Sequence, residues 1–439
     1  MKQIKNKIKS TEKQALYASA SLSPLGATGV LRVATECGCG PTKGSESPFA
    51  KEEREGAASP FRAGLGVSLF VLFCLLFASC NRGERTLSGL RKSDFATTVR
   101  GDSTALYVLR NAKDMEVCIT NYGGRVVSIM VPDRTNKLID VCLGHDSIAD
   151  YLKYGNNFGA LIGRYANRIS HSRFTLDGEE YHLAANDNGT SLHGGGPIAF
   201  HNRVWQAQQP DGQHLVLTTI SPDGEDGYPG ELNVKVTYAL SNDNALSIHY
   251  EATTTKPTVI NLTNHCYFCL SGDPTRDILD EQLTLNADYY TPIDRNIVPT
   301  GAIGSVSGTP LEFRWGKAVG YDINRTDNLQ IVYGRGYDHN FILNTAGDIT
   351  KMAARLVDPH SGVSMEIYTT EPGIQFYSGN FLDGGIIGKR GIAYPLRSAF
   401  SFETQHYPDS PNIPHFPSTV LRPGETYNTT TIYKFSKEQ

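Results

Sequence analysis

Long helical periodicity is almost absent from this chain of 439 residues. The sequence also lacks an internal repeat, and no apolar run reaches the roughly 20 residues that a membrane-spanning helix needs. Beyond the N-terminal region there is no basic stripe, and the formal net charge is -4. Because neutralising phosphates requires a basic face, we do not expect nucleic acid as a partner.

Short β-type segments are present instead, separated by turn residues that include many of the 43 Gly and 22 Pro. These segments are 105–110, 116–120, 126–131, 214–220, 232–238 and 245–251. The best candidate for a helix, 351–357, alternates in the manner of a strand, and a turn at 358–362 joins it to the alternating run 363–369, which predicts a hairpin. We therefore expect an all-β fold, a large antiparallel β-sandwich.

The first 80 residues are not expected to join that sandwich. Residues 1–60 are rich in Ser, Gly, Ala and Pro and show no apolar period, which indicates disorder or a start placed too far upstream. Within 61–80, an apolar run of 14 residues (65–78) follows basic residues and ends just before Ser79 and Cys80. This pattern predicts a signal peptide. It also resembles the lipobox of bacterial lipoproteins, with Phe77 in place of the usual Leu.

A used lipobox would make Cys80 the lipidated first residue of a protein anchored at the cell envelope without spanning the membrane. Two alternatives stay open, an uncleaved anchor and a false start upstream of a cytoplasmic enzyme. Residues 81–92 have the composition of a polar tether, and 93–439 show no second composition boundary. Large all-β folds reach this size as one domain, so we expect a single domain over 93–439.

Four of the eight cysteines fall in that domain, namely Cys118, Cys142, Cys266 and Cys269. Cys266 and Cys269 have the C-x-x-C spacing of zinc and redox sites. On a strand, however, positions three apart face opposite sides, and no second Cys/His pair completes a tetrahedral zinc shell. We therefore predict no metal site.

His265 lies at the centre of a β-type segment, 261–270, that is rich in asparagine and aromatic residues. Strand alternation places His265 and Tyr267 on one polar, aromatic face, and Leu262 and Phe268 on a mainly apolar face. Such a polar face suits a ring-shaped, hydroxyl-rich ligand such as a sugar. The alternative is a histidine with a purely structural role, whose hydrogen bonds are made within a sheet.

Other polar residues lie in glycine-rich or aromatic surroundings. His193 precedes three glycines, which could either turn the chain or let the backbone approach a ligand closely. Arg164 and Arg168 are either surface charges or donors to hydroxyl groups. Asp338 stands at the start of a strand, where Asp is most often a turn residue. Glu403 lies in an aromatic run, and a buried carboxylate without a role is uncommon.

Seven motifs resemble, in family order, those of the aldose 1-epimerases or galactose mutarotases. They are 163–169 (Gly-Arg-Tyr-Ala-Asn-Arg-Ile), 192–195 (Leu-His-Gly-Gly), 223–230 (Asp-Gly-Glu-Asp-Gly-Tyr-Pro-Gly), 264–268 (Asn-His-Cys-Tyr-Phe), 337–339 (Tyr-Asp-His), 372–377 (Pro-Gly-Ile-Gln-Phe-Tyr) and 403–405 (Glu-Thr-Gln). The resemblance implies that family's galactose mutarotase-like supersandwich. Cys266 and Cys269 replace the Ser or Thr and the Asn usual there.

The resemblance also implies an isomerase that interconverts the α and β anomers of free aldohexoses such as glucose and galactose. Ring opening requires a base for the anomeric hydroxyl and an acid for the ring oxygen. By resemblance Glu403 is the base, His265 is the acid, and His193 hydrogen-bonds near the ring oxygen. The implied sugar-binding residues are Asn167, Arg168, His193, Tyr267, Asp338 and Gln375. We expect a bell-shaped pH dependence, limited by the carboxylate on the acid side and, if the imidazolium is the acid form, by the imidazolium on the alkaline side.

No cofactor is expected to be required, and the resemblance leaves calcium open. We expect a monomer whose partner is a small aldose. Two other functions stay open. A mutarotase for hexose 6-phosphates would need a basic phosphate cluster, and a non-catalytic carbohydrate-binding sandwich would need neither acid nor base. The preferred aldose does not follow from the sequence.

Overall fold

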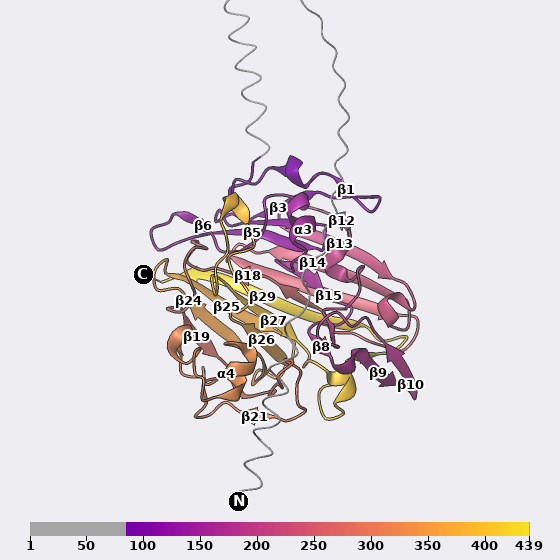
Figure 1. The fold of residues 1–439 in the computed structure, drawn as a ribbon. Coiled ribbons are helices and arrows are strands. Elements are labelled where there is room, and N and C mark those ends of the chain that lie inside the picture. Colours follow the sequence, from indigo (N-terminus) through magenta and orange to yellow (C-terminus); the bar gives the residue numbers. More distant parts are fainter. Residues whose placement is uncertain (1–84, 439) are drawn as a thin grey trace, which may run out of the picture. The chain divides into compact units, whose positions relative to one another are not determined.

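The computed structural model describes residues 85–438, and the strands that form its sheets pair in antiparallel fashion (Figure 1). The predicted all-β fold is confirmed. The predictions of a signal peptide over 61–80 and of a lipid at Cys80 lie outside the described residues. Within the described residues, no helix is both long and apolar enough to cross a membrane.

The largest sheet has nine strands. In its strand β14 (Leu232–Leu240) every second residue is buried, because the period of two sends alternate side chains to opposite faces. The strand order is β12 (Gln206–Gln208), β13 (His214–Ser221), β14, β15 (Ala245–Thr254), β29 (Tyr427–Lys437), β25 (Val363–Thr369), β24 (Ala354–Val357), β19 (Gln282–Leu285) and β22 (Lys317–Ala318). Strands β24 and β25 form the hairpin predicted between 351 and 369.

Two further sheets have six and four strands. The six-stranded sheet has the order β18 (Tyr267–Phe268), β27 (Phe400–Gln405), β26 (Gly373–Tyr377), β23 (Asp338–Leu343), β20 (Ala287–Tyr290) and β21 (Gly304–Ser305). The four-stranded sheet is β3 (Leu106–Arg110), β4 (Glu116–Thr120), β5 (Arg125–Pro132) and β6 (Leu138–Asp140).

The remaining elements are short. Two-stranded pairs are β1 (Thr98–Val99) with β2 (Asp102–Ser103), β9 (Arg173–Leu176) with β10 (Glu179–His182), β8 (Arg168–Ile169) with β11 (Ser191–Leu192), β7 (Ala160–Ile162) with β17 (Thr263–His265), and β16 (Thr258–Val259) with β28 (Val420–Leu421). The α-helices of the described part are α3 (Ile148–Tyr154) and α4 (Leu329–Gly334). The 3-10 turns are η2 (Lys92–Phe95), η3 (Ser170–Ser172), η4 (Phe200–Asn202), η5 (Glu225–Gly227), η6 (Val319–Tyr321), η7 (Lys389–Gly391) and η8 (Ser410–Asn412).

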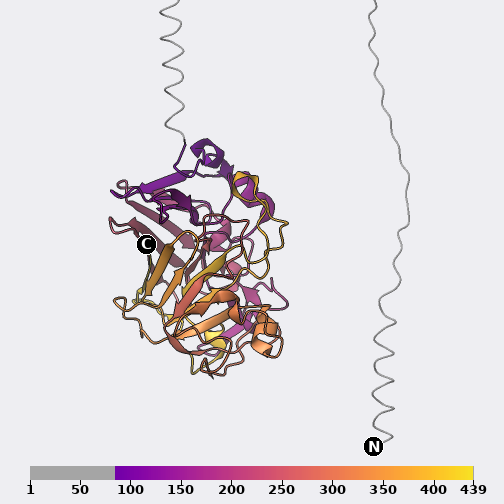
Figure 2. The ribbon, with the colours of Figure 1, turned by 90° about the vertical axis from the view of Figure 1, so that its left-hand side faces the viewer.

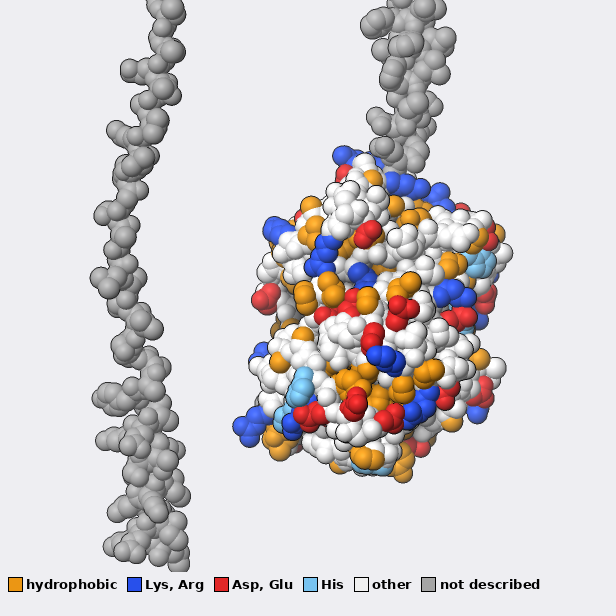
Figure 3. Space-filling model, turned by 90° about the vertical axis from the view of Figure 1, so that its right-hand side faces the viewer, with side chains coloured by type: hydrophobic (Ala, Val, Ile, Leu, Met, Phe, Trp, Pro, Cys, Tyr) orange, Lys and Arg blue, Asp and Glu red, His pale blue; other side chains and the backbone are white. Residues whose placement is uncertain are grey.

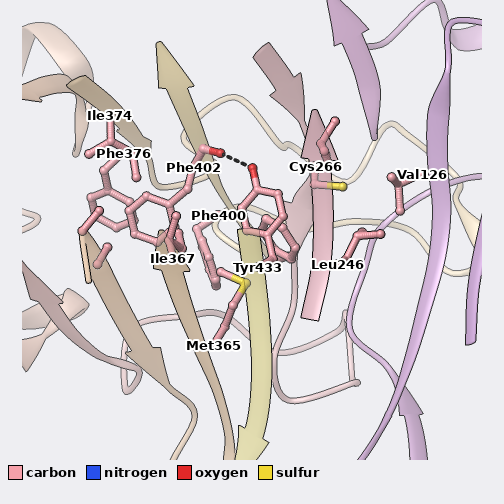
Figure 4. Close-up of a cluster of buried hydrophobic side chains, with 14 of the residues drawn as sticks. Val126, Leu246, Cys266, Met365, Ile367, Ile374, Phe376, Phe400, Phe402 and Tyr433 are labelled. Atoms are coloured by element: carbon pink, nitrogen blue, oxygen red, sulfur yellow. Dashed lines mark hydrogen bonds between the residues drawn. The ribbon is translucent and has the colours of Figure 1, made fainter. Parts of the chain in front are cut away.

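The main core fills the space between the nine-stranded and six-stranded sheets. Figure 4 shows Phe376 and Phe402 of the six-stranded sheet packed against Met365 and Tyr433 of the nine-stranded sheet. The Tyr433 hydroxyl donates to the backbone oxygen of Phe402 at 3.1 Å, so the polar end of this buried ring is satisfied. This face-to-face packing makes the fold a sandwich, and it commits one face of the six-stranded sheet to the core.

The four-stranded sheet is tied to a distant segment of the chain. Lys389 in η7 donates from Nζ to Asp140 at 2.6 Å and to the backbone oxygen of Val127 at 2.7 Å, and η7 lies beside this sheet in Figure 2. Both charged partners are buried. On the face in Figure 3, by contrast, acidic and basic side chains are interspersed on the surface.

The packed structure extends at least to residue 85. Leu90 is buried, and the backbone N–H of Leu87 donates to the buried Glu116 at 2.7 Å. Part of the segment 81–92, which composition marked as a polar tether, thus contacts the sandwich before residue 93.

Candidate active site

Polar side chains gather on the face of the six-stranded sheet that points away from the core. On β27, Phe402 points into the core, so its neighbour Glu403 points the other way. Gln375 on β26 is the register partner of Glu403, and Asp338 on β23 is the register partner of Tyr377. Three adjacent strands therefore supply the floor of one polar site.

His265 and Tyr267 reach this floor from two different strands. His265 ends β17 and pairs with β7, whereas Tyr267 begins β18 and pairs with β27. Between them the N–H of Cys266 donates to the Asn264 side chain at 3.0 Å instead of to a strand. The single strand expected across 261–270 is therefore wrong. The shared face is confirmed, since the rings of His265 and Tyr267 stack with centroids 5.0 Å apart.

Glu403 and His265 form a buried acid–imidazole pair. His265 Nε2 lies 3.6 Å from Glu403 Oε1, and Oε2 of Glu403 has no hydrogen-bond partner among residues 85–438. Burial raises the pKa of Glu403 to about 8, the charge of Asp338 adds to the rise and Arg168 opposes it. Burial lowers the pKa of His265 to about 4. At neutral pH the proton of the pair therefore resides on the carboxyl group.

His193 faces the same pair from the turn after β11. Its ring meets that of His265 edge to face, with centroids 5.2 Å apart. Its Nδ1 accepts a hydrogen bond from the backbone N–H of Asn167 at 3.2 Å, so the ring proton must sit on Nε2. Burial holds the pKa of His193 well below its usual value. His193 is thus a neutral ring in one fixed tautomer, with an N–H to donate.

Asn167 and Arg168 come from the loop into β8. Asn167 takes a positive φ of 60°, and its Oδ1 accepts from the N–H of Arg168 at 2.9 Å. The Arg168 side chain is largely buried, and its Nε donates to Asp187 at 2.8 Å. Its charge opposes the burial-driven rise in the pKa of Asp338, as it does for Glu403. The guanidinium charge therefore acts on both carboxyl groups of the floor.

Asp338 and Gln375 complete the predicted set. Gln375 Nε2 donates to Asp338 Oδ1 at 2.7 Å, and Gln405 donates to the Gln375 oxygen at 3.3 Å. This bond orients the Gln375 amide and leaves the second carboxylate oxygen of Asp338 for another donor. The structure thus brings all eight residues singled out from the sequence to one place.

Arg164 and the glycines of 194–196 serve packing instead. The buried Arg164 guanidinium donates to Ser221 and to the carbonyl oxygens of residues 229–230, so it holds that loop in place. A Cβ on Gly194 would lie 2.1 Å from the backbone oxygen of Gly163. Glycine is required there because two stretches of backbone touch.

Two residues on the floor were not predicted. The ring of Tyr377 meets that of Tyr267 edge to face at 5.9 Å, and Ser401 Oγ lies 3.2 Å from His265 Nδ1. Each stands two positions along its strand from a residue that was predicted, so strand alternation contained the signal. Asp187 was also missed, and no local pattern would have indicated that it pairs with Arg168.

The donor atoms of His193, His265 and Glu403 lie within 4.8 Å of one another. Two imidazoles and a carboxylate are ligand types that suit zinc. However, His193 could ligate through Nε2 only by moving its proton to Nδ1, which faces the N–H of Asn167. That hydrogen bond opposes metal coordination and favours a role as a hydrogen-bond donor.

Proton transfer on a hydroxyl-rich ligand is the chemistry that these side chains support. A buried acid–base pair beside amide and guanidinium donors, on the outer face of a large antiparallel sandwich, defines the class as enzymes that work by proton transfer. The model of one protein family, described as aldose 1-epimerase, matches residues 105–434. The chain therefore belongs to the aldose 1-epimerase family, and it is an isomerase.

Individual relatives agree over most of the chain. The chain is 44% identical over 336 residues to a galactose mutarotase of Rattus norvegicus, covering 76% of this chain and 95% of that protein. It is 38% identical over 340 residues to an aldose 1-epimerase of Escherichia coli K12, covering 77% and 97%. An aldose epimerase homologue from C. elegans superposes with a TM-score of 0.71 at 29% identity, covering 76% of this chain and 100% of that chain. A galactose 1-epimerase from Lactobacillus acidophilus gives 0.68 at 30% identity, covering 78% and 97%.

Proposed function

We propose that this isomerase interconverts the α and β anomers of free aldohexoses, such as glucose and galactose, by opening and reclosing the sugar ring. The observation that carries the proposal is the buried pair of Glu403 and His265. Oε2 of Glu403 has no partner within the described residues, so the carboxyl group keeps an oxygen for a ligand hydroxyl. The names of the relatives, galactose mutarotase and aldose 1-epimerase, support the same reaction.

In the proposed mechanism Glu403 is the base and His265 is the acid. Because the resting pair holds its proton on Glu403, that proton first passes to His265 Nε2, 3.6 Å from Oε1. Glu403 then takes the proton of the anomeric hydroxyl while His265 protonates the ring oxygen, and the bond between the anomeric carbon and the ring oxygen breaks. Rotation about the bond between the first two carbons, followed by the reverse transfers, closes the ring as the other anomer.

The remaining residues bind and orient the sugar in this proposal. His193 donates from Nε2 near the ring oxygen, and Asp338 accepts from sugar hydroxyls. Arg168, Asn167 and the Gln375 amide provide polar contacts, and the ring of Tyr267 supplies an apolar wall.

No cofactor enters the mechanism, because the side chains alone carry both protons. Calcium prefers six to eight oxygen ligands. Within residues 85–438, the cluster of three or more potential ligands is that of His193, His265 and Glu403, of which two are imidazoles. We therefore propose that no metal ion takes part in the proton transfers, and the family resemblance leaves calcium binding elsewhere in the chain open.

We further propose that the protein acts as a monomer anchored to the cell envelope by a lipid on Cys80. The 14-residue apolar run before Ser79 and Cys80 supports the anchor. A cytoplasmic location follows instead if the true start lies downstream of that run.

Polarimetry on freshly dissolved α-glucose and α-galactose tests the function. Purified protein should accelerate the approach to anomeric equilibrium far beyond the buffer rate, and α-glucose 6-phosphate should be a poorer substrate, because Arg168 is the only Arg or Lys among the residues assigned to this site. Sugar binding by calorimetry without acceleration would favour a carbohydrate-binding module. A marked preference for the phosphorylated sugar would favour a hexose-6-phosphate mutarotase.

A further inference from the structure

Asp187 is an acidic residue at the pocket that the proposed mechanism does not use. Its Oδ2 accepts a hydrogen bond from Nε of Arg168 at 2.8 Å. Within residues 85–438 the Arg168 guanidinium makes no other hydrogen bond. Its two terminal nitrogens therefore keep their four N–H groups for a ligand.

The turn that carries Asp187 is rigid. Asn188 and Gly189 take φ values of 46° and 82°, as in the two-residue hairpin loops that need left-handed backbone. The backbone N–H of Thr190 donates to the backbone oxygen of Asp187 at 2.7 Å. The Asn188 side chain donates to the second carboxylate oxygen at 3.0 Å. Both oxygens of Asp187 are thus fixed in direction.

The backbone of Arg168 is fixed as well. Its carbonyl oxygen accepts from the N–H of Asp409 at 2.8 Å, its N–H donates to Asn167, and β8 pairs with β11. Between two anchored backbones, the bond to Asp187 selects one direction for a side chain that otherwise has many rotamers. Such preorganisation reduces the entropy lost on binding.

We propose that Asp187 is a positioning residue for the sugar pocket. Asp187 holds the Arg168 side chain through Nε, and this contact aims the two terminal nitrogens of Arg168 at neighbouring sugar hydroxyls. The inference rests on the proposed function, in which Arg168 binds the sugar. An arginine that uses Nε and one terminal nitrogen for a carboxylate has fewer donors left, whereas one held at Nε alone keeps a fork that matches two adjacent oxygens.

The charge of Asp187 also balances that of Arg168. Their side chains are 23% and 10% exposed, so water screens the pair only weakly. Around Glu403 the other titratable groups are His265, His193, Asp338, the two tyrosines of the floor and, on the core side, Tyr433, and none of them carries a positive charge at neutral pH. Without Asp187, the unbalanced Arg168 charge would lower the pKa of Glu403.

Two variants of Asp187 and one matched control test the proposal. Asp187→Ala removes the acceptor, and Asp187→Asn keeps its shape but removes the charge. Asp177→Asn is the control, because Asp177 also lies in a hairpin turn with positive φ and pairs with an arginine, Arg422, at 2.8 and 2.9 Å, away from the site.

Losing the acceptor should raise KM for α-glucose about tenfold in Asp187→Ala while kcat changes little, since a hydrogen bond to a charged group is lost. Asp187→Asn should move the alkaline limb of kcat/KM to lower pH by about half a unit, through the unbalanced guanidinium. The limb should not move when Asp187→Asn is made in an Arg168→Met background. Asp177→Asn should change neither quantity.

A structural role would give a different pattern, in which kcat and the melting temperature fall together while KM and the alkaline limb stay in place. That pattern overturns the proposal, and so does a limb shift that persists without Arg168. Calorimetric sugar affinity separates this inference from the proposed function. If the wild-type protein binds sugar but shows no mutarotation, the proposed function is wrong. If the wild type and Asp187→Ala bind sugar with equal affinity, the proposed positioning role of Asp187 is wrong.

Discussion

Glu403 and His265 share one proton over a wide pH range, because burial penalises the charged form of each. The family resemblance implies Glu403 as the base and His265 as the acid, and burial of both groups favours a protonated carboxyl facing a neutral imidazole. Both descriptions contain the same number of protons, so they belong to one titration state of the pair. The neutral form avoids burying two separated charges, and binding of a polar ligand can then shift the proton.

Replacing either member of the pair should abolish most catalysis. Glu403→Gln keeps size and removes the base, and His265→Asn removes the acid and keeps a polar group. Each should fold, bind sugar by calorimetry and lose mutarotation by about 100-fold or more in polarimetry. The double variant should lose little beyond the worse single one, because the groups act as a unit. A folded Glu403→Gln protein with a near wild-type rate would remove Glu403 from the mechanism.

The pH dependence of kcat/KM should be a broad bell with limbs near the pKa values of about 4 and about 8. At pH values below the acid limb, His265 becomes protonated while Glu403 is still protonated, so the pair holds two protons. At pH values above the alkaline limb, Glu403 loses its proton and the pair holds none. This reverses the assignment expected from the sequence, in which the carboxylate limited the acid side. Rates measured in overlapping buffers check it. An alkaline limb that survives in Glu403→Gln would contradict the reversed assignment.

Strand alternation explains which parts of the site the sequence could reveal. It predicted that His265 and Tyr267 share a face, and applied to 373–377 and 400–405 it also contains Tyr377 and Ser401. It could not reveal that the strand is interrupted at Cys266, because that break depends on a bond from one side chain, Asn264, to the backbone. Contacts between distant segments, such as Asp187 with Arg168, have no local pattern.

The short helices escaped prediction for a related reason. Helix α3 has 7 residues and α4 has 6, too few for a period of 3.6 to stand out. Their ends are fixed by side chains that cap the first turn, Ser147 for α3 and Asn328 for α4. Such caps are common turn residues, so they identify a helix only once its position is known. The predicted strands at 214–220, 232–238 and 245–251 correspond to β13, β14 and β15, which have 8 to 10 residues and a largely alternating pattern of burial.

The two cysteines of the C-x-x-C pair lie outside the strands, Cys266 at the break between β17 and β18 and Cys269 just after β18. Cys266 packs in the main core and Cys269 in a second hydrophobic cluster. We therefore predict that the purified protein contains no stoichiometric zinc and keeps its activity after dialysis against a chelator. Elemental analysis of the wild type and Cys269→Ser tests this. One zinc per chain that is lost in the variant would contradict it.

At the scale of the whole chain, the location of the protein in the cell depends on the region before residue 85. If the lipobox is used, the mature protein begins at a lipidated Cys80. Cells labelled with a palmitate analogue should then show label on the wild type and none on Cys80→Ala, with both forms present in equal amount. Equal labelling of the two forms would exclude the anchor and favour a start downstream.

The six-stranded sheet has the polar site on one face and the core on the other, and this arrangement limits how such an enzyme can diversify. On β26 and β27, residues that face the core alternate one by one with residues that face the site. A single-residue insertion in either strand would therefore exchange the core-facing and site-facing residues. It would place Glu403 in the apolar core and a phenylalanine in the site. Substitutions in the loops that flank the site leave that alternation intact, so sugar preference can change there without moving residues of the core.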